Sequence, residues 1–168
     1  MVKLDEQVQS QWGQVENVYQ RRTDLIPNLV ASVKGAADFE KSTLTEVINA
    51  RAKATSVNVD PSKLTPESIQ QFQAAQGQLS QALGKLMVVV EKYPDLKANQ
   101  NFLELQSQLE GTENRITVER MKFNQVTQEY NSKIRSFPNN ITAGLFGFQK
   151  KGYFQAEAGS NKAPKVEF

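Results

Sequence analysis

The stretch VYQRRTDLIPNLVASVKG, residues 18 to 35, places a proline inside an amphipathic helical pattern, directly after a pair of arginines. The chain either continues through Pro27 as one kinked helix or turns back close to it. If Asp24 caps a new helix, Pro27 lies in the first turn, where its missing N–H sacrifices no intrahelical hydrogen bond. Inside a continuous helix the same proline costs about 3 kcal/mol or more. This stretch therefore decides the number of long helices.

Two further observations bear on this choice and favour opposite answers. Arg21 and Arg22 suit the last turn of a helix, where they complement the negative end of the helix dipole. In contrast, an apolar row keeps its phase across the proline, as a kinked helix requires, and consists of Trp12, Tyr19, Ile26 and Val33. A turn at residues 22–24 yields four apolar stripes that can enclose one core in up-down-up-down order. We therefore expect the turn.

The whole pattern predicts an all-α fold: an antiparallel up-and-down four-helix bundle with long helices and an irregular, aromatic-rich C-terminal tail. Thr65 and Pro66 are typical of a helix start, whereas Pro94 ends a helix and Asp95 can cap the next one. Within a single domain of residues 1–168, the predicted helices span residues 3–22, 24–55, 66–92 and 95–136, and the tail spans residues 137–168.

The composition excludes several classes of chemistry. The 168 residues include no cysteine and no histidine, which rules out disulfides, thiol nucleophiles and histidine-based triads. We expect no metal and no cofactor, because a ferritin-like carboxylate site needs Glu-x-x-His pairs. The formal charge of +2 is evenly mixed along the chain, so we expect no nucleic-acid surface. No apolar run approaches the roughly 20 residues of a membrane span.

The helix predicted at residues 95–136 carries an aromatic or aliphatic side chain at every seventh position, which is typical of a coiled-coil-like seam. These residues are Phe102, Leu109, Ile116, Phe123, Tyr130 and Phe137. The neighbouring rows are charged near the middle of the helix, where they contain Glu113, Glu119 and Arg120. Ion pairs between helices account for such residues. The alternative is a polar pocket inside the bundle.

The tail differs in composition from the helices. Five of the nine phenylalanines lie from Phe137 onward. Asn140 can cap a short helix that runs through Leu145 and ends before Gly147, and the alternation in PKVEF indicates an extended strap. The tail aromatic residues either close one end of the bundle or form a docking surface for a membrane interface or a partner.

Two dense blocks of sequence resemble a known family. NVYQRRTDLIPNLVASVKGAADFEKSTLTEVINARA, residues 17 to 52, and YNSKIRSFPNNITAGLFGF with the following KKGYFQAE and PKVEF, within residues 130 to 168, resemble the signature segments of the LemA family. The resemblance implies a bacterial protein with a short N-terminal tail, one membrane-spanning segment and a four-helix up-and-down bundle, and it implies no established enzymatic activity. Because the chain shows no such anchor, we expect that an upstream segment is missing from it.

We therefore expect a non-catalytic scaffold or adaptor, anchored in the cell membrane, with its domain in the periplasm. The expected partner is an envelope or membrane protein, and no small-molecule substrate is expected. The candidate interaction or structural residues are Arg21, Arg22, Asp24, Pro27 and Asn28 at the predicted turn, and Phe146, Phe148, Tyr153 and Phe154 in the tail.

Two alternatives stay open. The first is a lipid-binding module, with Lys150 and Lys151 at the headgroups and the tail aromatic residues at the membrane boundary. The second is a carboxylate enzyme that uses Glu113 and Glu119 with Arg120. Those two glutamates are six residues apart and so lie on different faces of a helix, which means that any pairing needs another helix.

Overall fold

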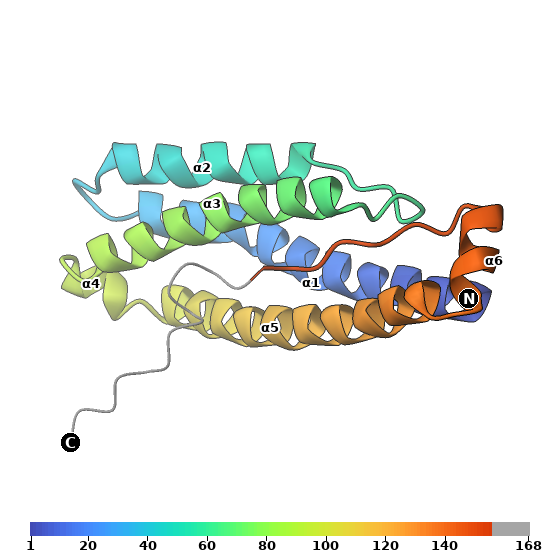
Figure 1. Ribbon diagram of the computed structural model, residues 1–168. Helices are drawn as coiled ribbons and strands as arrows, with labels where there is room; N and C mark the ends of the chain where they lie inside the picture. Colours follow the sequence, from blue (N-terminus) through green and yellow to red (C-terminus); the bar gives the residue numbers. More distant parts are fainter. Residues whose placement is uncertain (156–168) are drawn as a thin grey trace, which may run out of the picture.

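The computed structural model describes residues 1–155, which form helices and connecting segments without a strand. The helices are α1 (Val2–Lys34), α2 (Lys41–Ser56), α3 (Pro66–Val90), α4 (Pro94–Lys97), α5 (Gln100–Arg135) and α6 (Asn139–Phe146). The four long helices alternate in direction, with α1 packed along α5 and α2 packed along α3 (Figure 1). The N-terminus and α6 lie at the same end of the molecule (Figure 1). The prediction of an all-α fold is confirmed.

The predicted turn at residues 22–24 is wrong, because α1 runs unbroken through Pro27 to Lys34. Asp24 does not cap a helix; it is exposed and accepts a hydrogen bond from Gln20 Nε2, one turn earlier, at 2.8 Å. The apolar row that crosses the proline is buried along its whole length, at Trp12, Tyr19, Ile26 and Val33. Burial of this continuous row explains why an unbroken helix forms here in place of the turn. The helices predicted at residues 3–22 and 24–55 are replaced by α1 and α2.

Arg51 compensates for the donor that Pro27 lacks. A proline has no N–H, so the carbonyl of Thr23, four residues earlier, loses its intrahelical partner. Thr23 is buried, which keeps this oxygen from finding water easily. Nε of Arg51, on α2, donates to the Thr23 carbonyl oxygen at 3.2 Å. The Thr23 carbonyl therefore has a hydrogen-bond partner in spite of the proline.

The chain reverses between α1 and α2, at residues 35–40. Asp38 adopts a φ of 62°, in the left-handed region that Asp tolerates better than most residues. Phe39 anchors this turn, since it is buried and its ring centroid lies 4.8 Å from that of Tyr93. Tyr93 Oη also donates to the carbonyl oxygen of Asp38 at 2.8 Å. The turn is thus fixed by contacts with the connection after α3.

Capping explains the boundaries of α3 and α5. Thr65 caps α3 as predicted, because its Oγ1 accepts a hydrogen bond from the Ser68 N–H at 3.2 Å. The predicted cap of the last long helix is wrong: Asp95 lies within the short α4, and Asn99 Oδ1 accepts from the Phe102 N–H at 3.2 Å. The helices predicted at residues 66–92 and 95–136 therefore become α3, α4 and α5.

The buried apolar residues form two clusters, one toward each end of the molecule. The cluster that contains the α1–α2 turn and α4 includes Ile26, Leu29, Val33, Phe39, Val47, Leu79, Leu86 and Phe102. The cluster toward α6 includes Val8, Trp12, Val15, Tyr19, Ile69, Phe72, Phe123 and Tyr130. Along α1, α3 and α5, a polar layer that we define by Arg22, Gln76, Ser80 and Glu113 lies between them.

The seven-residue seam of α5 is buried from Phe102 to Tyr130, as predicted. Phe137 is an exception: it lies beyond the last residue of α5 and is 80% exposed. The seam therefore ends where the helix ends, and the last aromatic residue of the row belongs to a different surface.

Candidate functional site

Arg22 is the centre of the polar layer. It is 1% exposed, and its Nη1 donates to Ser80 Oγ at 2.7 Å and to Glu113 Oε1 at 2.9 Å. Its Nη2 donates to the carbonyl oxygen and Oε1 of Gln76 at 3.0 and 2.7 Å. The guanidinium carbon lies 5.2 Å from the ring centroid of Tyr19. A buried guanidinium needs such partners, and here they join α1 to α3 and α5.

The charged residues in the middle of α5 contact α1. Glu113 binds Arg22, whereas Glu119 Oε2 accepts a hydrogen bond from Gln11 Nε2 at 2.6 Å. The ion-pair interpretation is therefore confirmed for Glu113, and the two carboxylates bind different residues of α1. A shallow cavity of about 150 Å³ borders Glu113 and is also lined by Leu83, Gly84, Met87, Gln106, Leu109 and Glu110.

The five residues at the predicted turn do not form one site. Arg22 points into the interior, while Arg21, Asp24, Pro27 and Asn28 are exposed along α1. Two of these exposed residues, Arg21 and Asp24, border a groove of about 400 Å³ between α1 and α5, which is also lined by Leu25, Gln108, Gly111, Thr112 and Arg115.

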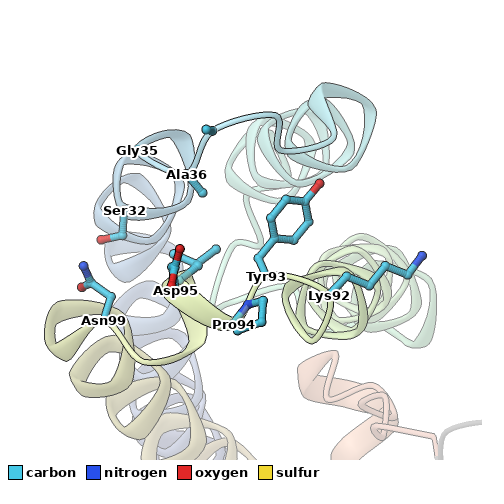
Figure 2. Close-up of a pocket in the computed structure, with 10 residues that line it drawn as sticks. Ser32, Gly35, Ala36, Lys92, Tyr93, Pro94, Asp95 and Asn99 are labelled. Atoms are coloured by element: carbon cyan, nitrogen blue, oxygen red, sulfur yellow. The ribbon is translucent and has the colours of Figure 1, made fainter.

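A hollow of about 420 Å³ lies where the end of α1 meets the connection between α3 and α5, and the sequence did not predict it (Figure 2). Its lining residues are Ser32, Gly35, Ala36, Ala37, Lys92, Tyr93, Pro94, Asp95, Leu96 and Asn99. Lys92 points away from Asp95, so the two charges do not converge (Figure 2). Within residues 1–155 no cluster of three Asp, Glu, His or Cys residues could hold a metal ion.

The segment of residues 148–155, which we call the tail strap, occupies the space between α3 and α5. It runs back from α6 in an extended conformation, roughly along α5 (Figure 1). The neighbouring side chains supply hydrogen bonds to its backbone. Helix side chains therefore supply the hydrogen bonds that a neighbouring strand would supply in a sheet.

Three side-chain amides each bind the N–H and the carbonyl of one strap residue. Asn131 accepts from the Lys151 N–H at 2.9 Å and donates to its carbonyl at 3.0 Å. Asn124 makes the same pair of bonds with Phe154, at 2.9 and 3.0 Å. Gln73, on α3, makes them with Gln155, at 2.9 and 2.6 Å, and Arg120 Nη2 also donates to the Gln155 carbonyl, at 2.9 Å.

Three strap residues also fit the bundle closely. Phe154 and Lys151 do so through their side chains, and Gly152 does so because it has none. Phe154 is 4% exposed, and its ring lies among those of Trp12, Tyr19, Phe72 and Phe123. Lys151 is 6% exposed; its Nζ lies 2.7 Å from Asp5 Oδ1 and 4.8 Å from the ring centroid of Tyr130. Gly152 has no room for a side chain, because a Cβ there would lie 2.7 Å from Pro66 Cα.

The tail aromatic residues, which were expected either to close one end of the bundle or to form a docking surface, are divided between the interior and the surface. Phe154 is buried, Phe148 and Tyr153 are half-buried, and Phe146 is 73% exposed. Lys151, which the lipid alternative placed at the headgroups, is buried against Asp5. That part of the alternative is wrong, because a lysine side chain buried in the bundle cannot contact lipid headgroups. The extended strap predicted at PKVEF lies outside the described residues.

Four exposed aromatic and aliphatic residues lie instead on and beside α6. We call this set the α6 face; it consists of Phe137, Ile141, Leu145 and Phe146, which are 80%, 57%, 79% and 73% exposed. The short helix itself was predicted, and Gly147 ends it with a φ of 73°. Within α6 only Ala143 is buried. The α6 face is therefore an apolar patch at the end of the molecule where the chain begins.

Burial perturbs two tyrosines of the interior. It raises the pKa of Tyr130 to about 12, and the nearby Asp5 carboxylate adds to the effect. Tyr130 Oη donates to the carbonyl oxygen of Gln149 at 3.0 Å, which binds the start of the tail strap to α5. Burial also raises the pKa of Tyr19, against the opposing charges of Arg120 and Arg22. Both phenols are therefore neutral hydrogen-bonding or packing groups at neutral pH.

Sequence reasoning missed the groups that hold the tail strap. Asn124 and Asn131 are seven residues apart, which places them on one face of α5, but a polar pair at this spacing is also typical of a solvated helix face. Gly152 carried no signal either, because its close contact is with Pro66, far away in the sequence.

Comparisons with known proteins relate the chain to one family model and to several curated relatives. The model of the LemA family matches residues 11–168. The protein LemA of Metamycoplasma hominis is 25% identical, over 93% of this chain and 68% of its own length. Magnetosome protein MamQ 2 of Paramagnetospirillum magneticum and magnetosome protein MamQ of Magnetospirillum gryphiswaldense are each 27% identical, over 92% and 91% of this chain. The chain spans 63% and 62% of the length of these two relatives. No helix within residues 1–155 is long and apolar enough to cross a membrane.

Proposed function

Because this chain belongs to the LemA family, we propose that it is the helical domain of a membrane-anchored scaffold or adaptor that binds envelope proteins and catalyses no reaction. In this proposal the four long helices form the up-and-down bundle that the family resemblance implies, and the domain lies in the periplasm. The observation that carries the proposal is the α6 face. It offers an apolar patch at the end of the molecule where a preceding anchor would enter.

The α6 face differs from the scattered apolar residues found on most protein surfaces. Its four members come from residues 137–146, and each is more than half exposed. Contiguous exposed apolar residues mark interaction surfaces, whereas single ones need no explanation. The N-terminus and α6 lie at the same end of the molecule, so a membrane segment upstream of Met1 brings the α6 face close to the bilayer and to other membrane proteins (Figure 1). This position suits an adaptor.

The interior supports a non-catalytic role. The charged groups near the middle of α5 are bound to other helices, as Glu113 is to Arg22 and Glu119 is to Gln11. Carboxylates held in this way join helices, and these two bind different residues of α1. The two apolar clusters on either side of the polar layer are built from packed aliphatic and aromatic residues.

Site-specific photocrosslinking in the full-length, membrane-anchored protein tests the adaptor role. A crosslinker at Leu145, which is 79% exposed on α6, is compared with one at Val88, which is 67% exposed on α3. We expect Leu145 to capture discrete membrane proteins reproducibly from native membranes, and Val88 to capture none of them. The absence of any reproducible product at Leu145, or the same products at both positions, contradicts the proposal.

A second candidate is direct lipid contact, and the basic residues around the α6 face favour it. Lys133 and Arg135, in the last turn of α5, and Lys150, after α6, are exposed. Each such residue contributes about 1 kcal/mol near an anionic surface, which assists an anchor but does not replace it. Flotation of the chain with phosphatidylglycerol vesicles tests this candidate. Binding that Leu145→Asp abolishes and Val88→Asp preserves supports it, and no binding contradicts it.

A further inference from the structure

The contacts of the tail strap describe a binding site for an extended peptide. The backbone of Lys151, Phe154 and Gln155 is bound by side-chain amides of α5 and α3, and the N–H of Gly152 donates to the carbonyl oxygen of Leu64 at 2.9 Å. Hydrogen bonds to the main chain give affinity for any extended segment, and pockets for particular side chains give specificity. Both components are present here.

The spacing of the two asparagines on α5 matches that of an extended chain. Seven residues of α-helix span about 10.5 Å, and three residues of extended chain span about 10 Å. Asn131 and Asn124, seven residues apart, accordingly bind Lys151 and Phe154, three residues apart. This agreement requires the bound segment to be extended, and it makes no demand on its side chains.

Side-chain selectivity comes from three positions of the strap. The first takes a basic residue, because its pocket holds the Asp5 carboxylate and the Tyr130 ring. The second takes only glycine, since a Cβ would meet Pro66 Cα at 2.7 Å and the Thr65 carbonyl oxygen at 3.0 Å. The fourth takes an aromatic residue, among the rings of Trp12, Tyr19, Phe72 and Phe123. The third position, Tyr153, is half-buried and makes no specific contact that would select it.

We propose that the groove between α3 and α5 is a recognition site for an extended segment of a partner protein with the pattern basic–glycine–any–aromatic, and that the chain's own tail fills it until that partner competes. The inference rests on the proposed adaptor role and adds the chemistry of the partner segment. Competition is possible because the strap is joined to α5 through α6, of which only Ala143 is buried. The other groups that hold this connection are the half-buried Phe148 and the carbonyl oxygen of Gln149, which accepts a hydrogen bond from Tyr130 Oη.

The Gly152→Ala variant of the full chain tests the proposal, because it expels the strap without altering any residue of the groove. The probe is a fluorescein-labelled peptide GFQKKGYFQ, which copies residues 147–155, and binding is measured by fluorescence anisotropy. The Gly144→Ala variant is the matched control, since a Cβ at Gly144 meets no atom within 4 Å. Phe154→Ala expels the strap independently, and serves as well if the Gly152 variant does not fold.

We expect the Gly152→Ala chain to bind the peptide at least tenfold more tightly than the wild type or Gly144→Ala. In the last two chains the attached strap competes at an effective concentration in the millimolar range. Peptides with alanine in place of the glycine or of the phenylalanine are expected to bind at least tenfold more weakly. Equal binding by the Gly152→Ala and Gly144→Ala chains, or by the altered peptides, overturns the proposal. A wild-type dimer that the peptide dissociates overturns the assignment to a foreign segment, because the second copy would then be the occupant.

This assay uses no membrane and no natural partner. A negative result can therefore be distinguished from a negative result in the crosslinking test of the adaptor proposal. A groove that binds no peptide leaves crosslinking at Leu145 unaffected. Conversely, an absence of crosslinked proteins leaves peptide binding by the purified chain intact.

Discussion

At the scale of single residues, a side chain on one helix satisfies a backbone group that another helix leaves free. Pro27 removes the donor for the Thr23 carbonyl, and Arg51 supplies another from α2. The proline is therefore tolerated because of a contact that forms only in the folded protein. A local reading of the sequence assigns the full cost of the proline to α1 and predicts a turn.

A double-mutant cycle tests this compensation. Arg51→Ala leaves the buried Thr23 carbonyl without a partner, so we expect it to lower the free energy of unfolding by about 1–3 kcal/mol. In the Pro27→Ala background the new N–H at residue 27 can bind the same carbonyl, and we expect the cost to fall below about 1 kcal/mol. Urea denaturation of the four chains measures both values. An equal cost in the two backgrounds contradicts the assigned role of Arg51.

Tyr130 offers a second test at this scale, through its pKa of about 12. An unfolded tyrosine titrates near pH 10, so the folded state favours the neutral phenol. The stability that this preference contributes is complete below about pH 10 and is lost as the pH rises from 10 to 12. Absorbance at 295 nm should show an ionisation near pH 12 that Tyr130→Phe removes and Tyr153→Phe retains. A titration curve that is the same in Tyr130→Phe as in the wild type would contradict it.

At the scale of the elements, side-chain amides of α3 and α5 hold the tail strap in place and contribute to the free energy of unfolding. Asn131→Ala removes both hydrogen bonds to Lys151 and leaves buried backbone groups unpaired, so we expect a loss of about 1–3 kcal/mol in the free energy of unfolding. Asn28→Ala is the control, because Asn28 is exposed on α1 and the helix-propensity change is the same. Chemical denaturation measures both variants. An equal effect of the two substitutions argues against the amide contacts.

Local signals in the sequence predicted the helices better than the connections. Thr65 and Pro66 fixed the start of α3, and the seven-residue row predicted a buried face on α5. The turn at residues 35–40 was missed because it depends on Phe39 packing against Tyr93, a contact between distant segments. The cap of α5 was assigned to Asp95 because the sequence does not show that Pro94 begins a helix of its own.

The sequence identified some residues of the candidate sites, but it did not identify the residues that they contact. Arg22 and Phe154 were both selected, the first for a turn that does not form and the second for a surface that is buried. The hydrogen-bond partners of Arg22 come from α3 and α5, and the rings around Phe154 come from α1, α3 and α5. No pattern within one helix reveals them. The α6 face was only partly foreseen, since of its members Phe146 alone was named as a candidate.

At the scale of the whole molecule, the polar layer is the contact that joins α1, α3 and α5 near their middles. Arg22→Ala leaves Gln76 and Ser80 without their donor inside the protein, and we expect it to lower the free energy of unfolding by roughly 3 kcal/mol. Glu113→Gln keeps an acceptor on a side chain that is 47% exposed, so we expect a cost below about 1 kcal/mol. Thermal and urea denaturation separate the two outcomes. Similar costs for both variants would show that the ion pair, and not the buried hydrogen bonds, dominates the layer.

The separation of the apolar residues into two clusters also bears on how such a sequence changes over evolutionary time. A substitution in one cluster, such as at Val47, is compensated by repacking among its own neighbours, because Phe72 and the rings around it belong to the other. Mutations at distant, independent sites have additive effects. Conservative substitutions at the end that carries the α1–α2 turn should therefore leave the packing around the strap at the other end intact.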